Sequence, residues 1–392
     1  MERSRLNLLE NRISQLENEI LEISQQEVIV ENDFVDMFSE PHGELWEKLK
    51  EKGDLAKFTN FTEVELLSLY RKLVPFIQNH RRRGPLPKIS FSDSLLILLT
   101  FYKTALEFDE LAVFLGYKSS TLMAAINRMR PILYDCLQDE WLAHPQRPQP
   151  LDDTHFPFIG LLVDSTSIEV FRPRTHFNEA KVYYDGKNRI YALKKEVGVL
   201  ASNPHYCVFT QKSFVGSRHD YEYFKENYRT YLPYLVKTTE EFRTLKDDQE
   251  HQSWAVLLDK GYIGPECETH DLRKLTPLKN PTRNADIMEN REKSLIRVPV
   301  ECFFGRLKKL WKILRGIYRW SHENFDIDFD ICCLLTNLHI KSNRLEEIDR
   351  TFLLQLFQQK NLVLEEKEKK RKKTVTEYKR RKKRKLTDLQ TK

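Results

Sequence analysis

Three acidic residues, far apart in the sequence, have the types and settings that metal-dependent cleavage of a phosphodiester requires. Two are aspartates that end short apolar runs, since Asp164 follows the letters LLV and Asp259 follows AVLL. A short apolar run that stops at a turn signal is typical of a buried strand, where a carboxylate must be paired or neutralised. An ion pair with a basic side chain meets that need and so does a bound cation. Two such aspartates favour the cation.

The third acid, Glu301, lies near the start of the segment RVPVECFFGRLKKLWKIL. On a helical wheel the large apolar residues of this segment share one side. The opposite side contains the acid, a glycine and three cations: Glu301, Gly305, Lys308, Lys312 and Arg315. We expect the glycine to let another backbone approach closely. The helix dipole alone explains a first-turn acid but not the glycine and the basic residues beside it.

Carboxylates from two strands and a helix suit Mg²⁺, with Mn²⁺ as a substitute, because hard cations prefer carboxylate and phosphate oxygens. Two such ions clamp the attacking and leaving oxygens of a phosphodiester displacement. The residues therefore predict that Asp164, Asp259 and Glu301 are catalytic and bind two metal ions. We expect the basic face, Lys308, Lys312 and Arg315, to hold DNA phosphates.

The elements around these acids predict a mixed α/β domain. Runs rich in Val, Ile, Phe and Tyr alternate with helical stretches after a Pro-rich boundary at residues 143–157. The predicted strands cover 158–171, 190–201 and 205–216, followed by helices at 219–246, a strand from 254 and helices at about 298–360.

Residues 60–142 predict an all-helical domain. Thr62 and Glu65 have the spacing of a capping box. A short amphipathic helix then ends at Gly116, and a serine begins the next helix, which is the pattern of a helix-turn-helix. The alternative is an ordinary pair of packed helices. On the first interpretation, the second helix contacts DNA through Ser120, Asn127 and Arg128.

Both ends of the chain have simple repetitive patterns. Apolar residues from 6 to 23 follow a heptad spacing, which predicts a coiled coil within residues 1–32 and a homodimer, or else an amphipathic helix packed on its own domain. Residues 365–392 carry 14 Lys or Arg against 5 Asp or Glu, although the whole chain has a net charge of only +6. We interpret them as a disordered basic tail that directs the protein to the nucleus, rather than a solvated end without a receptor. No apolar run is long enough to predict a membrane span.

Two further segments offer weaker signals. Cys267 and His270 form one half of a zinc-site pattern without a second half, so an ordinary buried thiol is the favoured interpretation. The segment that follows begins with basic residues and is rich in Pro and Asn. It predicts a loop beside the site, in which Arg273 and Lys274 contact DNA; a solvated surface loop is the alternative.

Four segments, VDST, GSRHDYEYF, LLDKGYIG and RVPVECFFGRLKKLW, resemble in this order the DDE transposases of the PIF/Harbinger type. The resemblance covers about residues 158–345 and implies an RNase H-like domain that cuts and joins DNA with Mg²⁺. It matches the family triad to Asp164, Asp259 and Glu301. His219 and Asp220 match a pair near the family's site and are accessory residues. Relatives can also require a separate DNA-binding partner protein.

Three functions therefore compete. The leading one is a nuclear DNA endonuclease or transposase that uses a carboxylate triad. The second is a domesticated DNA-binding protein that keeps the fold without catalysis. The third is a coiled-coil interaction protein with a basic tail, which leaves the two aspartates after apolar runs unexplained.

Overall fold

The computed structural model describes most of the chain between residues 40 and 343. The described residues are 40–80, 87–143, 146–174, 176–245, 252–264 and 272–343, together with 374 and 376–377. The predicted coiled coil, nearly all of the predicted basic tail and the half-site of Cys267 and His270 lie outside them. Within them, no helix combines the length and apolar character needed to cross a membrane.

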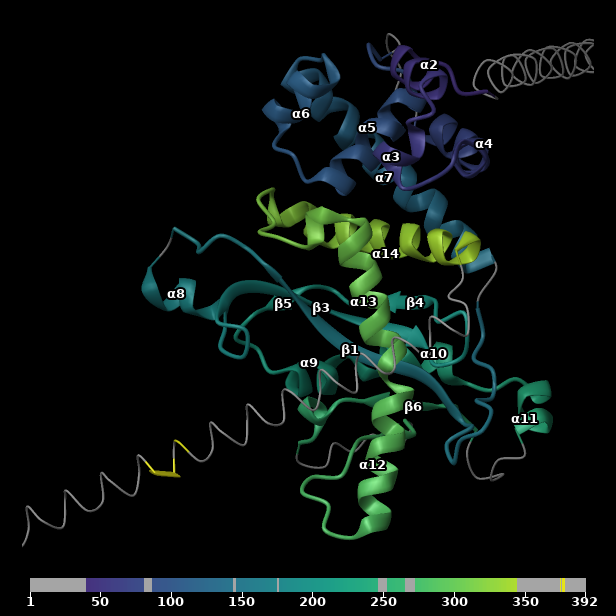
Figure 1. Cartoon of the computed structure of the whole chain (residues 1–392), viewed down its shortest axis with the longest axis vertical. Coiled ribbons are helices and arrows are strands. Elements are labelled where there is room, and N and C mark those ends of the chain that lie inside the picture. Colours follow the sequence, from purple (N-terminus) through teal and green to yellow (C-terminus); the bar gives the residue numbers. More distant parts are fainter. Residues whose placement is uncertain are drawn as a thin grey trace, which may run out of the picture.

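The N-terminal part of the described chain is a bundle of helices, drawn at the top of Figure 1. Thr62 caps α4 through the predicted capping box with Glu65. Gly116, with a φ of 78°, ends α6 in the left-handed conformation that glycine adopts without strain. The helices are α2 (Glu44–Glu51), α3 (Leu55–Thr59), α4 (Glu63–Asn79), α5 (Phe91–Thr104), α6 (Phe108–Leu115) and α7 (Ser119–Ala143).

The second part is built on a mixed sheet with strand order β2-β3-β1-β6-β7, while β4 and β5 also pair with β3. Its two long strands, β1 and β3, are antiparallel, whereas β6 runs parallel to β1. The strands are β1 (Ile159–Glu169), β2 (Tyr184–Asp185), β3 (Ile190–Leu200), β4 (Cys207–Thr210), β5 (Phe214–Val215), β6 (Ala255–Leu258) and β7 (Lys274–Leu275). This mixed sheet with flanking helices fits the predicted α/β nuclease-like domain.

Helices and 3-10 turns surround this sheet. In Figure 1, α13 crosses the sheet and α14 lies between the sheet and the helical bundle. The helices are α8 (Phe177–Val182), α9 (Asp220–Asn227), α10 (Leu232–Leu235), α11 (Thr239–Leu245), α12 (Asn284–Ile296), α13 (Val298–Leu310) and α14 (Phe325–Ser342). The 3-10 turns are η1 (Tyr228–Tyr231), η2 (Lys260–Tyr262), η3 (Lys312–Leu314) and η4 (His322–Asn324).

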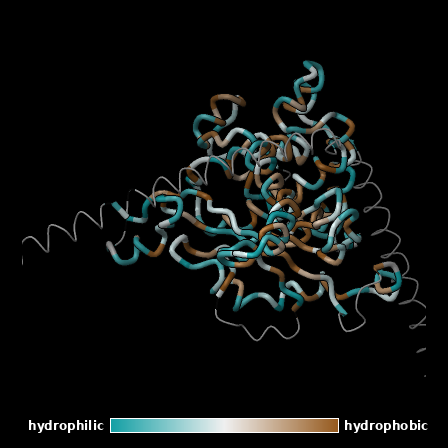
Figure 2. Tube along the Cα trace, turned by 60° about the horizontal axis from the view of Figure 1, so that its bottom comes forward, coloured by the Kyte–Doolittle hydropathy of each residue, from teal (hydrophilic) through white to brown (hydrophobic). Residues whose placement is uncertain are grey.

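One apolar core runs through both parts. Figure 2, which colours the chain trace by hydropathy, shows that hydrophobic stretches gather in the interior of the molecule. The core strand residues 161–163 of β1 and all of β6 are fully buried. Between the helical bundle and α14, buried Arg130 of α7 pairs with buried Asp328. The sheet is therefore held from one side by α14, which itself is fixed to the bundle.

The predicted strand 158–171 agrees with β1 to within two residues at each end. Asp164, however, lies in the middle of this strand rather than at its end, because the residues beyond it continue to pair with β3 as far as Glu169. The helical wheel fails after Leu310, because buried Trp311 takes an extended conformation (φ −118°, ψ 94°) and ends α13. The expected loop between the second and third acids is also largely structured, since it contains strand β7 and helix α12.

Candidate active site

The pairing of β1 with β6 places the two aspartates side by side. Val163 lies opposite Leu258 in this parallel pair, and the next residue on each strand is an aspartate. Neighbouring strands are separated by roughly 4.8 Å, so Asp164 and Asp259 begin from adjacent backbone positions. The Asp164 side chain is mostly buried, whereas 36% of the Asp259 side chain is exposed. This pair of acids is therefore accessible from the Asp259 side.

An arginine that we did not predict from the sequence joins the two aspartates. Arg297 donates from Nη2 to Asp164 Oδ2 at 2.8 Å and from Nη1 to Asp259 Oδ1 at 3.0 Å. Its side chain is only 9% exposed. The sequence interpretation favoured a cation over a basic side chain as the partner of Asp259, and in this structure the partner is the guanidinium.

The single guanidinium leaves a surplus of negative charge. The pKa of Asp164 is raised to about 6, chiefly by burial; the negative charge of Asp259 acts in the same direction, while Arg297 and the Ser165 N–H act in the opposite direction. Ser165 N–H donates to Asp164 Oδ1 at 2.9 Å. Two carboxylates and one guanidinium carry a net charge of −1 when all are ionised.

Glu301 lies one helical turn from this cluster. It is in the first turn of α13 and is exposed, and Arg297 is the residue directly before that helix. Residues four apart share a face of a helix, so Glu301 follows Arg297 on the same side of α13. Within the described ranges no group of three or more His, Cys, Asp or Glu is arranged to hold a metal. The structure thus brings two of the three predicted acids together and does not join Glu301 to them.

The predicted basic face of α13 is only partly formed. Lys308 lies on the helix, where it donates to the Ser167 backbone oxygen at 3.3 Å, and burial lowers its pKa. Lys312 and Arg315 are exposed but lie beyond the end of α13, so they do not continue the face of Glu301. Gly305 is exposed, and a Cβ atom there would meet open space, so the expected close backbone contact does not exist within the described chain.

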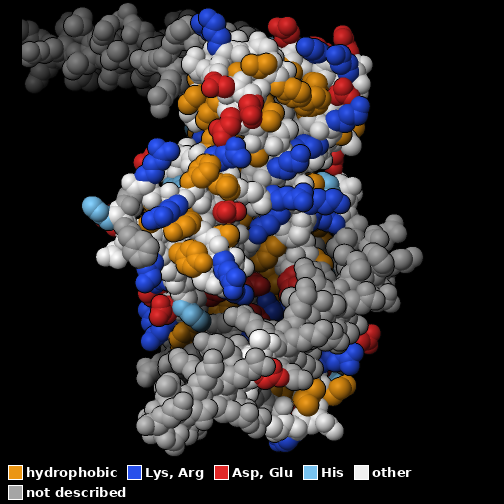
Figure 3. Space-filling view, turned by 60° about the vertical axis from the view of Figure 1, so that its left-hand side comes forward, with side chains coloured by type: hydrophobic (Ala, Val, Ile, Leu, Met, Phe, Trp, Pro, Cys, Tyr) orange, Lys and Arg blue, Asp and Glu red, His pale blue; other side chains and the backbone are white. Residues whose placement is uncertain are grey.

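The other predicted DNA contacts differ in their availability. Ser120 and Asn127 are exposed on α7. Arg128 instead donates to the Ile89 backbone oxygen at 2.9 Å and lies over the Phe91 ring, so its contacts within the bundle do not favour DNA binding. Figure 3 shows Lys and Arg side chains gathered across the middle of one face, below the helical bundle.

Lys274 belongs to an edge strand rather than to a loop, and Arg273 directly precedes this strand, with its carbonyl oxygen accepting the Val256 N–H. Lys274 pairs with Val256 across β7 and β6. The Arg273 guanidinium lies 3.5 Å from the centre of the Phe158 ring. The edge strand therefore fixes both backbones beside β6, the strand that leads to Asp259.

The accessory pair occupies the start of α9. His219 caps this helix by accepting the Tyr221 N–H at Nδ1. Asp220 forms an ion pair with Lys194 of β3 at 3.1 Å. Glu196, two residues further along β3, is fully buried and accepts a hydrogen bond from the Tyr231 hydroxyl. The pKa of Glu196 is raised to about 8, chiefly by burial; a hydrogen bond from Tyr262 lowers it, and the charges of Asp220 and Asp164 raise it. Sequence patterns gave no signal for this buried acid.

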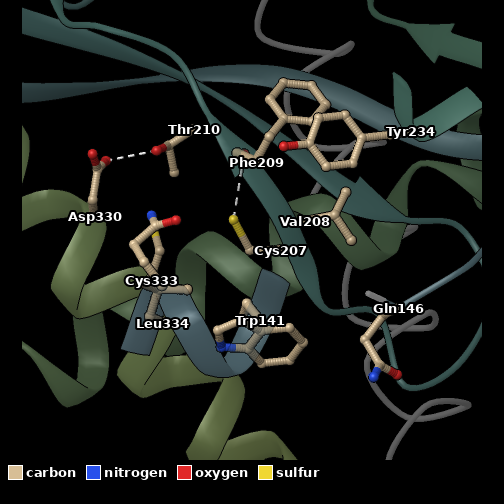
Figure 4. Close-up of a pocket in the computed structure, with 11 residues that line it drawn as sticks. Trp141, Gln146, Cys207, Val208, Phe209, Thr210, Tyr234, Asp330, Cys333 and Leu334 are labelled. Carbon is tan, nitrogen blue, oxygen red and sulfur yellow. Dashed lines mark hydrogen bonds between the residues drawn. The ribbon is translucent and has the colours of Figure 1, made fainter. Parts of the chain in front are cut away.

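The main cavities lie away from the aspartates. Figure 4 shows one of about 120 Å³ between β4, α7 and α14, where Thr210 donates to Asp330 and the Cys207 thiol to the Phe209 carbonyl. A larger groove, of about 680 Å³, runs beside Cys302 and Arg306 of α13. Neither is lined by a predicted catalytic residue. The candidate site lies instead where β1 and β6 bring Asp164 and Asp259 together.

A comparison with known families agrees with this location. Residues 163–337 match the family described as DDE superfamily endonuclease. The matched segment begins one residue before Asp164 and includes Asp259, Arg297 and Glu301. The match supports a DDE-type transposase family and a nuclease function for this part of the chain. It does not distinguish the PIF/Harbinger type. No curated protein and no solved structure matches the chain.

Proposed function

We propose that this chain is a metal-dependent DNA endonuclease of the transposase type, with Asp164, Asp259 and Glu301 as its catalytic acids. The observation that carries the proposal is the adjacency of Asp164 and Asp259 on parallel strands, which a single guanidinium bridges. The DDE superfamily match over the same residues supports it. The PIF/Harbinger type remains our more specific assignment, based on the sequence segments.

The donor set fits a hard divalent cation. Asp164 and Asp259 supply carboxylate oxygens at a partly exposed position. Glu301 lies one helical turn after Arg297, the residue that contacts both aspartates. These three residues would hold Mg²⁺ or Mn²⁺, and we propose two ions. The bound ions would supply charge neutralisation and Lewis acidity at the scissile phosphate. The chain itself contributes the fixed separation of β1 and β6, which sets the spacing of the two aspartates, and the positive charge of Lys308.

DNA binding and assembly extend this proposal. Exposed Ser120, Asn127, Lys312 and Arg315 are available to contact DNA, with Arg273 and Lys274 beside β6. We propose a homodimer through residues 6–23, a nuclear location directed by the basic tail, and, as in relatives of the proposed type, the option of a separate DNA-binding partner.

Nicking of supercoiled plasmid in the presence of Mg²⁺ or Mn²⁺ tests the catalytic proposal. Asp259→Asn removes a charge with little change of shape, and we expect at least about a hundredfold loss of nicking, equivalent to roughly 2.7 kcal/mol of barrier. Asp152→Asn makes the same change at an exposed position and should leave nicking unchanged. Equal nicking by both variants would contradict the assignment of Asp259.

The second candidate is a DNA-binding protein without catalysis. The ion pairs of Arg297 favour it, because they give each aspartate a basic partner from the chain itself. Metal titration separates the two candidates. A protein that binds DNA but no Mn²⁺, and that nicks neither plasmid nor DNA carrying element ends, would be the silent form.

A further inference from the structure

Arg297 occupies an unusual place in the backbone. It is the single residue between α12 and α13, so it caps the end of one helix and the start of the next. Its own backbone is helical (φ −79°, ψ −14°). Pro299 follows within the first turn of α13. The junction of two helices therefore sets where the guanidinium projects, and both helices would respond if it moved.

The contacts of Arg297 leave its guanidinium incompletely satisfied. Its two terminal nitrogens bond to one oxygen of each aspartate, whereas buried Nε has no hydrogen-bond partner among the described residues. A buried arginine with an unpaired Nε is held by charge more than by complete hydrogen bonding. Its position between the acids depends on their negative charge, which is the same charge that a divalent cation would need.

We propose, building on the proposed metal-dependent function, that Arg297 is a positioning residue that acts as the counter-ion of the metal-free site and competes with the divalent cation. The Arg297 guanidinium lies within about 3 Å of both carboxylates. It would therefore repel a cation bound by Asp164 and Asp259. Cation binding therefore requires the guanidinium to leave at least one of the aspartates. The released side chain remains beside Glu301, four residues later on α13.

The competition has two opposite effects on the protein. Without metal, Arg297 stabilises the fold by compensating two carboxylates, one of them mostly buried. With metal, the same residue lowers the affinity, because its ion pairs must first be broken. A merely structural arginine would have the first effect alone.

Titration with Mn²⁺, followed by the electron paramagnetic resonance signal of free Mn²⁺, tests the proposal on the full chain without any assay of activity. We expect Arg297→Gln to bind Mn²⁺ about tenfold more tightly than the unchanged protein, as the loss of a direct competitor would give. Its midpoint of thermal unfolding should fall without metal and recover as Mn²⁺ is added. Arg283→Gln, at the other end of α12 and paired with Asp286 on the surface, is the matched control and should change neither quantity.

The outcomes separate the two proposals. If the unchanged protein binds Mn²⁺, Asp259→Asn does not, and Arg297→Gln binds no more tightly than the unchanged protein, the counter-ion proposal is wrong and the proposed metal site stands. If none of the three binds Mn²⁺, both proposals are overturned. Should Arg297→Gln fail to fold, Arg297→Met gives a second measurement. It removes the charge but keeps a long side chain, and affinity equal to or below that of the unchanged protein would overturn the proposal.

Discussion

Within the part of the chain that the structure describes, a buried arginine meets aspartate in two places, and these differ in how completely the charge is compensated. At the junction of α7 and α14, Arg130 faces a single acid, Asp328. The hydroxyls of Tyr102 and Tyr318 each donate to the same carboxylate at 2.8 Å. At the candidate site, Arg297 faces two acids and its Nε is unpaired. One cluster is balanced and closed, and the other carries surplus charge and is partly open.

A third cluster shows that surplus charge alone does not define a site. Lys195 is shared by Asp326 and Asp330 of α14. There Thr210 donates to Asp330 and Ser213 donates to Asp326, so hydrogen bonds satisfy what the single cation does not. Near Arg297 the corresponding donors are fewer among the described residues. Exposure does not separate the two clusters, because the Asp326 side chain is 41% exposed and that of Asp259 is 36% exposed. The combination of surplus charge and few donors is what distinguishes the candidate site from a structural ion pair.

The largest expected effect comes from breaking the balanced cluster. Arg130→Met leaves Asp328 buried and uncompensated, and we expect it to lower the free energy of unfolding by about 3–5 kcal/mol. Urea unfolding followed by circular dichroism measures this. The control, Arg71→Met, removes an exposed arginine paired with Glu40 and should change stability by less than about 0.5 kcal/mol. Similar losses in the two variants would mean that the burial of the pair is unimportant.

A smaller effect is expected at Glu196, a buried acid without a cation. Its pKa is raised from 4.5 to about 8, so the folded protein holds a proton that the unfolded chain releases. The resulting stabilisation is fully present at a pH below 4.5, the pKa of Glu196 in the unfolded chain. It is lost as the pH rises through about 8, the pKa of Glu196 in the folded protein. Between about pH 5 and 8, we expect the protein to lose on the order of 2–3 kcal/mol more stability than Glu196→Gln.

The matched control for this pH dependence is exposed Glu222, on the neighbouring helix α9. Glu222→Gln should keep the pH dependence of the unchanged protein. Urea unfolding at several pH values gives the three curves. Parallel curves for the unchanged protein and Glu196→Gln would mean that Glu196 is ionised in the folded state.

The smallest expected effect on stability is at the candidate site itself. Asp164→Asn removes a carboxylate that is desolvated and repelled by Asp259, and this offsets the loss of its bond to Arg297. We expect a change of less than about 1 kcal/mol in the free energy of unfolding, together with loss of plasmid nicking. Asp328→Asn is the paired variant in the balanced cluster and should be clearly more destabilising. A reversed order would remove the distinction between the two clusters.

The residues that could be predicted from the sequence have local causes. The capping box of Thr62 and the glycine that ends α6 depend on neighbours within a few positions, and both are confirmed. The apolar run before Asp259 corresponds to β6 residue for residue, because a strand buried on both faces needs no alternation. The predictions that failed depended on tertiary partners. Pairing with β3 carries β1 past Asp164, and Trp311 leaves the helix to reach Thr336 on α14.

Arg297 was missed for a related reason. A long side chain at a helix junction follows no periodic pattern, and its partners lie 38 and 133 residues away. One signal was available, because two carboxylates expected in a buried sheet required a counter-ion. The arginine four residues before Glu301, on the same helical face, was the nearest in sequence to the third acid.

Helix α13 also has a mechanical consequence. Its 13 residues form a rod of about 20 Å that begins directly after Arg297. At its far end, Asn60 of the helical bundle donates to the Leu310 carbonyl at 2.8 Å, and the Phe61 ring packs on Trp311. A helix is stiff along its axis, so α13 holds Arg297 and Glu301 at a set distance from the point where the bundle contacts Leu310.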